Sequence, residues 1–253
     1  MKTISSRLVA FSSIAIVVCA MIISPVSALG VSRITPDQSN TQRCTKLKTL
    51  AEANEAKMSE RLSAMQLDFQ KRLTSVSSRH DMVDQKATTF RAERSDRFEA
   101  KVAALRNKDG LTDAQLAAID EFEVTIKTAE KTRETAVDTA RATYREALDQ
   151  VIAEHQGTLL DAATVFQKAV KAALTTAQAN CGDTSATVSL RASIKTARDS
   201  FQSTRKTDAI KTTIKQLAET RREAVQAANT EFKTSVTTAA SALKMALENN
   251  DNS

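Results

Sequence analysis

Apolar residues recur every three or four positions along most of the chain after residue 40. The steps average about 3.6 residues, which places these side chains on one face of an α-helix. The spacing predicts three long helices, over 41–108, 112–181 and 184–248. The apolar face of the first comprises Leu47, Ala51, Met58, Leu62, Met65, Phe69, Leu73, Val76, Val83, Ala87, Phe90, Phe98, Val102 and Leu105. Because the spacing departs from a strict 3.5-residue repeat, it predicts a weakly twisted bundle rather than a regular heptad coiled coil.

Turn residues lie between the three stretches. Gly110 can adopt the left-handed conformation that ends a helix, and Thr112 with Gln115 has the spacing of a capping box at the start of the next one. Gly182 predicts a second helix end, followed by Asp183 or Thr184 as a cap. The third stretch is rich in Thr, which lowers helix propensity, so we expect it to be the least stable of the three.

The three stretches have matched lengths, and the connections between them are short. Such connections force neighbouring helices to run antiparallel. We therefore predict an all-α, elongated up-down-up three-helix antiparallel bundle, a coiled-coil-like rod of roughly 100 Å at 1.5 Å per residue. The composition agrees, because 4 Gly and 2 Pro in 253 residues are too few for the turns of a sheet domain, and 4% aromatic residues favour narrow seams between helices.

The positions of two cysteines test the antiparallel arrangement of the first two predicted helices. Cys44 lies 66 residues before Gly110 and Cys181 lies 71 residues after it, so antiparallel helices bring both to the same end. We predict a Cys44–Cys181 disulfide. The alternatives are two unrelated thiols or pairing between chains.

The N-terminal segment has the features of a secretory signal peptide over residues 1–28. Lys2 and Arg7 precede an apolar stretch over 8–23, and Val26 to Ala28 offers small residues for cleavage. This stretch is shorter than the roughly 20 residues that span a bilayer as a helix. We expect export to the periplasm, cell surface or extracellular space; the alternative is a membrane tether through an uncleaved segment. Residues 29–40 are predicted to be a flexible lead-in and 249–253 a disordered tail.

Charge differs between the three predicted helices. Lys and Arg number 15 against 9 Asp and Glu over 43–108, 7 against 11 over 113–180, and 11 against 6 over 184–248. An acidic middle helix between two basic ones suits antiparallel packing. The basic balance also allows weak contact with anionic lipid or a wall polymer, whereas nucleic acid is disfavoured because no recognition motif is present and export is expected.

The sequence offers little catalytic chemistry. His80 and His155, its only histidines, fall about 15 residues apart in level in the hairpin, roughly 22 Å, so they cannot share a metal. No phosphate-binding loop, nucleophile elbow or metal-ligand spacing occurs. We therefore predict no enzyme activity, no metal site and no cofactor.

The expected function follows from these features. We expect an exported, non-enzymatic helical rod that acts as a cell-envelope or surface spacer, scaffold or protein-interaction module. One alternative is an exported holdase-type chaperone with long helical arms, which would hold clients with Met-rich seams such as Met58 to Met65. Another is a binder of anionic envelope polymers.

Overall fold

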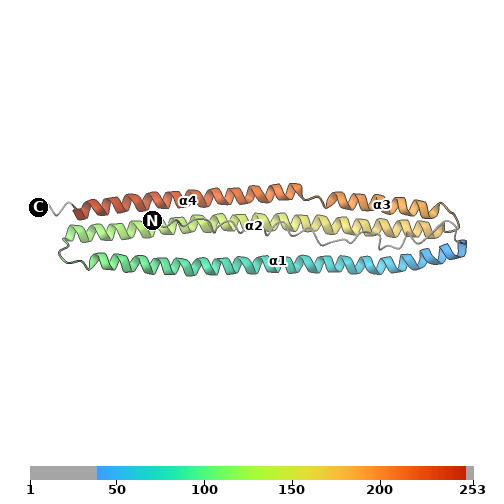
Figure 1. The fold of residues 1–253 in the computed structure, drawn as a ribbon, viewed down its shortest axis with the longest axis horizontal. Coiled ribbons are helices and arrows are strands. Elements are labelled where there is room, and N and C mark those ends of the chain that lie inside the picture. Colours follow the sequence, from blue (N-terminus) through green and yellow to red (C-terminus); the bar gives the residue numbers. More distant parts are fainter. Residues whose placement is uncertain (1–38, 249–253) are drawn as a thin grey trace, which may run out of the picture. The chain divides into compact units, whose positions relative to one another are not determined.

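The computed structural model describes residues 39–248 and contains four α-helices (Figure 1). They are α1 (Asn40–Arg106), α2 (Asp113–Ala179), α3 (Ala186–Thr204) and α4 (Asp208–Glu248). No strand occurs in that range, so the predicted all-α helical bundle is confirmed. The expected signal peptide, residues 29–38 of the lead-in and the C-terminal tail lie outside the described residues, and Asn40 already belongs to α1.

The contacts divide the chain into two compact units, each built from parts of several helices. Unit 1 contains α1 up to Thr74, the second half of α2 from Gln150, all of α3, and α4 up to Ile214. Unit 2 contains Ser75–Asp149, which includes the α1–α2 turn, and α4 from Lys215 onward. Each unit has an apolar core of its own.

The turn between α1 and α2 forms as the sequence predicts. Gly110 has a φ of 80°, in the left-handed region that favours glycine. The backbone amide of Thr112 donates to Oε1 of Gln115 at 3.0 Å, and the amide of Gln115 donates to Oγ1 of Thr112 at 3.3 Å. This reciprocal pair satisfies two amides that the first turn of α2 would otherwise leave without partners.

The inward face of α1 repeats every 11 residues. Such a repeat corresponds to 3.67 residues per turn and gives a slight right-handed twist rather than the left-handed supercoil of heptads. One series of buried or half-buried positions is Arg43, Asn54, Met65, Val76, Ala87 and Phe98, and a second is Leu47, Met58, Phe69, His80, Arg91 and Val102.

The apolar core of unit 1 forms two clusters. In the first, Leu47 of α1 packs with Val170 and Leu174 of α2 and with Leu190 and Ile194 of α3. The second joins Met65 and Phe69 to Leu159 of α2. These clusters hold α1 and α3 against α2.

Unit 2 has a smaller apolar core at its turn end. Val102, Ile119 and Leu243 come from α1, α2 and α4, and the rings of Phe98 and Phe122 lie beside them with their centres 6.1 Å apart. Between Val102 and Phe69, no apolar side chain of α1 is fully buried. Ion pairs with α2 therefore hold this part of α1.

The third predicted helix is not continuous, which corrects the expected single helix over 184–248. Residues 205–207 separate α3 from α4 without Gly or Pro. The inward positions explain the interruption, because Phe201 is buried in α3 and the next inward apolar residue is Ile210 of α4. Nine residues make about two and a half turns, so one straight helix would direct these two side chains to opposite faces.

Hydroxyl side chains of the last turn of α3 bond back to the backbone of that helix. Those of Ser203 and Thr204 both donate to the carbonyl of Ser200, at 2.7 and 3.3 Å. Helix α4 then begins beyond Thr207, whose carbonyl accepts the amide of Lys211 at 2.9 Å. The break therefore lets both α3 and the start of α4 pack their apolar faces within unit 1.

The prediction that the apolar face of the first helix points inward is wrong at two of its residues. Leu73 is 38% exposed and Phe90 is 66% exposed. Arg72 and Arg91, each next to one of them, occupy the half-buried positions instead. The 11-residue repeat selects Arg91, which pairs with acidic residues of α2, so tertiary charge pairing decides which side chain faces inward.

Candidate functional site

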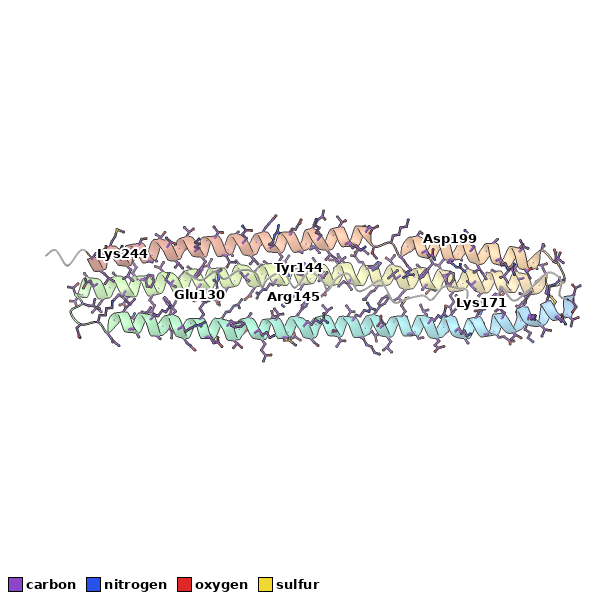
Figure 2. All side chains as sticks on the ribbon, in the orientation of Figure 1. Glu130, Tyr144, Arg145, Lys171, Asp199 and Lys244 are labelled. Carbon is purple, nitrogen blue, oxygen red and sulfur yellow. A yellow bond between two sulfur atoms is a disulfide. The ribbon has the colours of Figure 1, made fainter. Side chains whose placement is uncertain are left out.

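The predicted cysteine pair lies in unit 1, where α1 begins and α2 ends. The two sulfur atoms are at disulfide distance, and the Cα atoms of Cys44 and Cys181 lie 5.1 Å apart (Figure 2). That spacing is typical of disulfides. The hairpin geometry expected from the sequence is therefore present.

Arg43 reinforces this end of unit 1. Its side chain is 2% exposed, and its Nε and Nη2 atoms donate to the carbonyls of Cys181 and Gly182 at 3.3 and 3.1 Å. A second Nη2 bond reaches Oδ1 of Asn40. Because carbonyls beyond a helix C-terminus have no partner within the helix, the buried guanidinium satisfies groups that the end of α2 leaves open.

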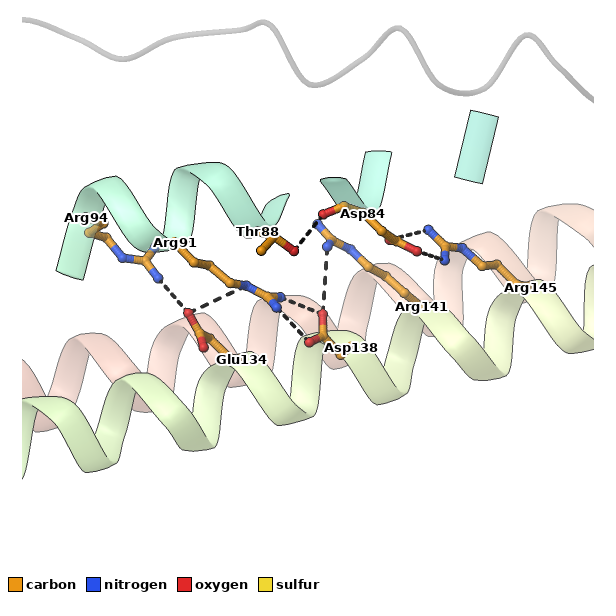
Figure 3. Close-up of polar contacts among 8 residues, drawn as sticks. All are labelled: Asp84, Thr88, Arg91, Arg94, Glu134, Asp138, Arg141 and Arg145. Atoms are coloured by element: carbon orange, nitrogen blue, oxygen red, sulfur yellow. Dashed lines mark hydrogen bonds and ion pairs between the residues drawn. The ribbon is translucent and has the colours of Figure 1, made fainter. Parts of the chain in front are cut away.

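A row of ion pairs joins α1 to α2 in unit 2 (Figure 3). Arg145 of α2 donates to both carboxylate oxygens of Asp84 at 2.6 and 2.7 Å, and Arg91 of α1 does the same to Asp138 at 2.8 and 2.5 Å. Arg94 bridges Glu130 and Glu134, and Arg106 bridges Asp120 and Glu123. The acidic middle helix and the basic first helix thus meet in pairs.

These pairs shift the ionisation of the carboxylates. The hydrogen bonds from Arg145 hold the pKa of Asp84 below its ordinary range, and those from Arg91 do the same to the pKa of Asp138. Both carboxylates stay charged at neutral pH. The row therefore aligns α1 with α2.

The seam between α2 and α4 in unit 2 uses arginines differently. The guanidinium of Arg133 lies over the ring of Phe232, and that of Arg221 lies over the ring of Tyr144, each 4.4 Å from the ring centre. Figure 2 shows Tyr144 and Arg145 on α2, and their contacts reach α4 and α1 respectively. Two adjacent residues of α2 therefore contact two different helices, α4 and α1.

A groove of about 340 Å³ runs along this seam. Its walls come from α2 and α4, and most of the side chains that line it are small. The lining residues are Val124, Thr125, Thr128, Ala129, Thr132, Arg133 and Ala136 of α2, with Ala228, Glu231, Phe232 and Ser235 of α4. Val124 is an apolar residue that is 66% exposed at this groove. Small side chains on two neighbouring helices allow the backbone of a further helix to come close.

The groove carries one charge of each sign. Burial lowers the pKa of Arg133, whose guanidinium rests on Phe232 and, within residues 39–248, makes no hydrogen bond or ion pair with a carboxylate. Glu231 is exposed, and its carboxylate likewise has no ion-pair partner in that range. The sequence could not identify this site, because its residues converge only once α2 and α4 are aligned.

The histidines belong to different units. His80 is half-buried on α1 in unit 2, and His155 is half-buried on α2 in unit 1, where burial lowers its pKa. No group of three His, Cys, Asp or Glu side chains within residues 39–248 is placed to hold a metal ion.

Met58 and Met65, the residues of the chaperone alternative, pack in the cores of unit 1. Met65 belongs to the cluster with Phe69, and Met58 packs against the cluster around Leu47. Met65 is buried, and Met58 is half-buried.

None of the helices within 39–248 combines the length and the apolar character that crossing a membrane requires. No protein-family model, curated protein or solved structure matches the chain. The functional assignment therefore depends on the contacts and charges within the two units.

Proposed function

We propose that the chain is an exported, non-enzymatic helical module that acts at the cell envelope or surface as a spacer or adapter, with the α2–α4 groove of unit 2 as its protein-binding surface. The main support for this proposal is the shape and charge of the groove. It is concave and lined mainly by small side chains, and it holds an arginine and a glutamate whose charges have no ion-pair partner in the described range.

The chemistry of the rest of the bundle supports a binding role. The charged groups of the α1–α2 seam in unit 2 are engaged with one another, and the carboxylates of Asp84 and Asp138 are held ionised by arginines. A general acid or base needs a pKa close to the working pH, whereas these pKa values move away from neutrality. Paired groups of this kind stabilise alignment rather than catalyse a reaction.

Site-specific photo-crosslinking in the producing cells tests this function. A photo-reactive residue replaces Thr132 in the groove, and a matched variant carries it at Thr89, an exposed threonine of α1 in unit 2. We expect a discrete protein adduct from position 132 and none from position 89. Equal labelling at both positions, or none at either, would contradict the proposed binding surface.

Export is tested separately on the same cells. The protein should be recovered outside the cytoplasm with Leu29 as its first residue, as intact-mass measurement would show. A mass that includes residues 1–28 would instead support the membrane-tethered alternative.

One observation favours a second candidate, adsorption to an anionic polymer through unit 1. The described part of unit 1 contains 15 Lys and Arg against 9 Asp and Glu, whereas that of unit 2 contains 18 against 19. Lys46, Lys48 and Lys57 of unit 1 make no ion pair within the described range. Binding to a purified wall polymer should then weaken steeply as salt is raised, and replacing these three lysines with Gln should reduce it.

A further inference from the structure

We propose that the occupant of the α2–α4 groove is the same groove of a second copy of this chain, related by a two-fold axis that runs along the groove parallel to the helices. This inference rests on the proposed function, because it names the partner that the groove binds. It is carried by the chemistry of the groove itself, which is complementary to its own copy.

The charges of the groove are self-complementary. Arg133 lies on the α2 wall and Glu231 on the α4 wall, and neither is neutralised by an ion pair within residues 39–248. They stand at the same level, because Arg133 stacks on Phe232, the residue next to Glu231. A two-fold interface brings residue i against residue j and residue j against residue i. Each Arg133 therefore meets Glu231 of the other copy, and two ion pairs form.

The direction of the axis follows from the same residues. Rotation about an axis parallel to the helices keeps every residue at its level and places each α2 against the α4 of the other copy. Rotation about an axis across the helices would place Arg133 against Arg133, and like charges in contact oppose association. Only the first arrangement pairs the charges of the groove.

A foreign helix fits these charges less well. An acidic helix would pair with Arg133 and face Glu231, whereas a basic helix would do the reverse. A second copy supplies both signs at matching positions. The groove walls of the two copies can approach closely because their side chains are small, as at Ala129, Thr132 and Ala228. The exposed Val124 gives each copy an apolar contact at the groove.

Charge reversal on the purified protein tests the proposal by sedimentation equilibrium. The unchanged protein should form dimers at roughly 100 μM, well above a micromolar dissociation constant. Arg133→Glu alone places two glutamates together across the interface, and Glu231→Arg alone places two arginines together. Each should weaken dimerisation by roughly tenfold or more, since like charges at an interface are costly.

Mixing the two variants separates contact between copies from effects within one chain. In the mixed dimer, position 133 of each copy again faces an opposite charge at position 231 of the other copy. An equimolar mixture should therefore recover dimers that neither variant forms alone. A double variant that carries both reversals should also recover them. If each variant dissociates the dimer and the mixture stays monomeric, the reversals act within the chain and the proposal is wrong.

Matched reversals outside the groove serve as controls. Lys131→Glu and Glu223→Arg change exposed residues of the same helices that do not line the groove, and they should leave dimerisation unchanged. Circular dichroism and thermal melting show that each variant is folded. An unchanged protein that remains monomeric at roughly 100 μM, or a dimer that tolerates both groove reversals, would overturn the inference. The crosslinking at Thr132 would still decide the proposed function, because an adduct with a different protein supports a binding surface without self-association.

Discussion

The guanidinium of Arg221 lies 4.4 Å from the ring centre of Tyr144, and this pair is the counterpart of Arg133 over Phe232 with the two helices exchanged. Helix α2 supplies the cation in one pair and the ring in the other. The two pairs are 11 residues apart on both helices, which is the repeat of the inward positions on α1. The two contacts therefore define the alignment of antiparallel α2 and α4 in unit 2.

Energetic coupling between Arg221 and Tyr144 follows from this stacking. We expect a double-mutant cycle with Arg221→Gln and Tyr144→Leu to give about 0.5 to 1 kcal/mol of coupling in the free energy of unfolding, as for partly exposed cation–π pairs. Urea unfolding measures it. The same cycle with the exposed neighbour Arg222 in place of Arg221 should show no coupling, and equal coupling for both arginines would mean that stacking is not the cause.

Phe69 and Phe90 should respond oppositely to truncation. Phe69 is 4% exposed and packs with Met65 and Leu159, so Phe69→Ala should lower the free energy of unfolding by about 3 to 5 kcal/mol. Phe90 is 66% exposed, so Phe90→Ala should change stability by less than about 0.5 kcal/mol. Chemical denaturation of the two variants checks both values, and similar losses would contradict the inward face described for α1.

Reduction of the cysteine pair should destabilise the protein. The bond closes a loop of 137 residues, and in the chain-entropy model its loss costs at most about 5 kcal/mol. We expect a lower melting temperature after reduction and in a Cys44→Ala, Cys181→Ala variant. Thiol titration should release two thiols from the native protein on reduction. Unchanged melting without thiol release would show that the two cysteines are not linked.

Acid should weaken the Asp84–Arg145 pair in unit 2. The hydrogen bonds from Arg145 lower the folded pKa of Asp84 below its ordinary value of 3.8. A carboxylate with a lowered pKa contributes stability above that ordinary value and loses it as the pH falls through the folded pKa. Asp84→Asn should therefore flatten the loss of stability below pH 3.8.

At neutral pH, the same Asp84→Asn change should cost no more than about 1 kcal/mol, because solvent screens the half-exposed carboxylate. High salt should reduce that cost further. Asp96→Asn, an exposed residue of α1 without an ion pair in the described range, is the matched control. A steeper acid transition in the Asp84 variant than in the control would contradict the pairing.

The sequence predicts the helices, the first turn and the cysteine pair because each depends on local spacing or on counting along antiparallel helices. It misplaces Phe90, because a count of apolar residues favours Phe90 over Arg91, and only the carboxylates of α2 make an inward arginine favourable. It predicts a weak third helix from the threonines but no interruption. The nine-residue interval between Phe201 and Ile210 is the signal that reveals the break.

The groove could not be found in the same way. Arg133 and Glu231 are nearly 100 residues apart in the chain, and each resembles an ordinary charged residue on a helix. Their shared level depends on the alignment of α2 with α4, which the contacts of the two stacked arginines define. Sequence spacing along one helix contains no information on that alignment.

The interruption at residues 205–207 also divides the chain into segments that can change length independently. One residue inserted within α1 would rotate all later inward positions by about 100°, so every packed side chain beyond it would lose its partner. An insertion between Thr204 and Asp208 would fall where the helical phase is already reset, and α3 and α4 would keep their packing on α2. We therefore expect natural or engineered insertions to be tolerated at this joint.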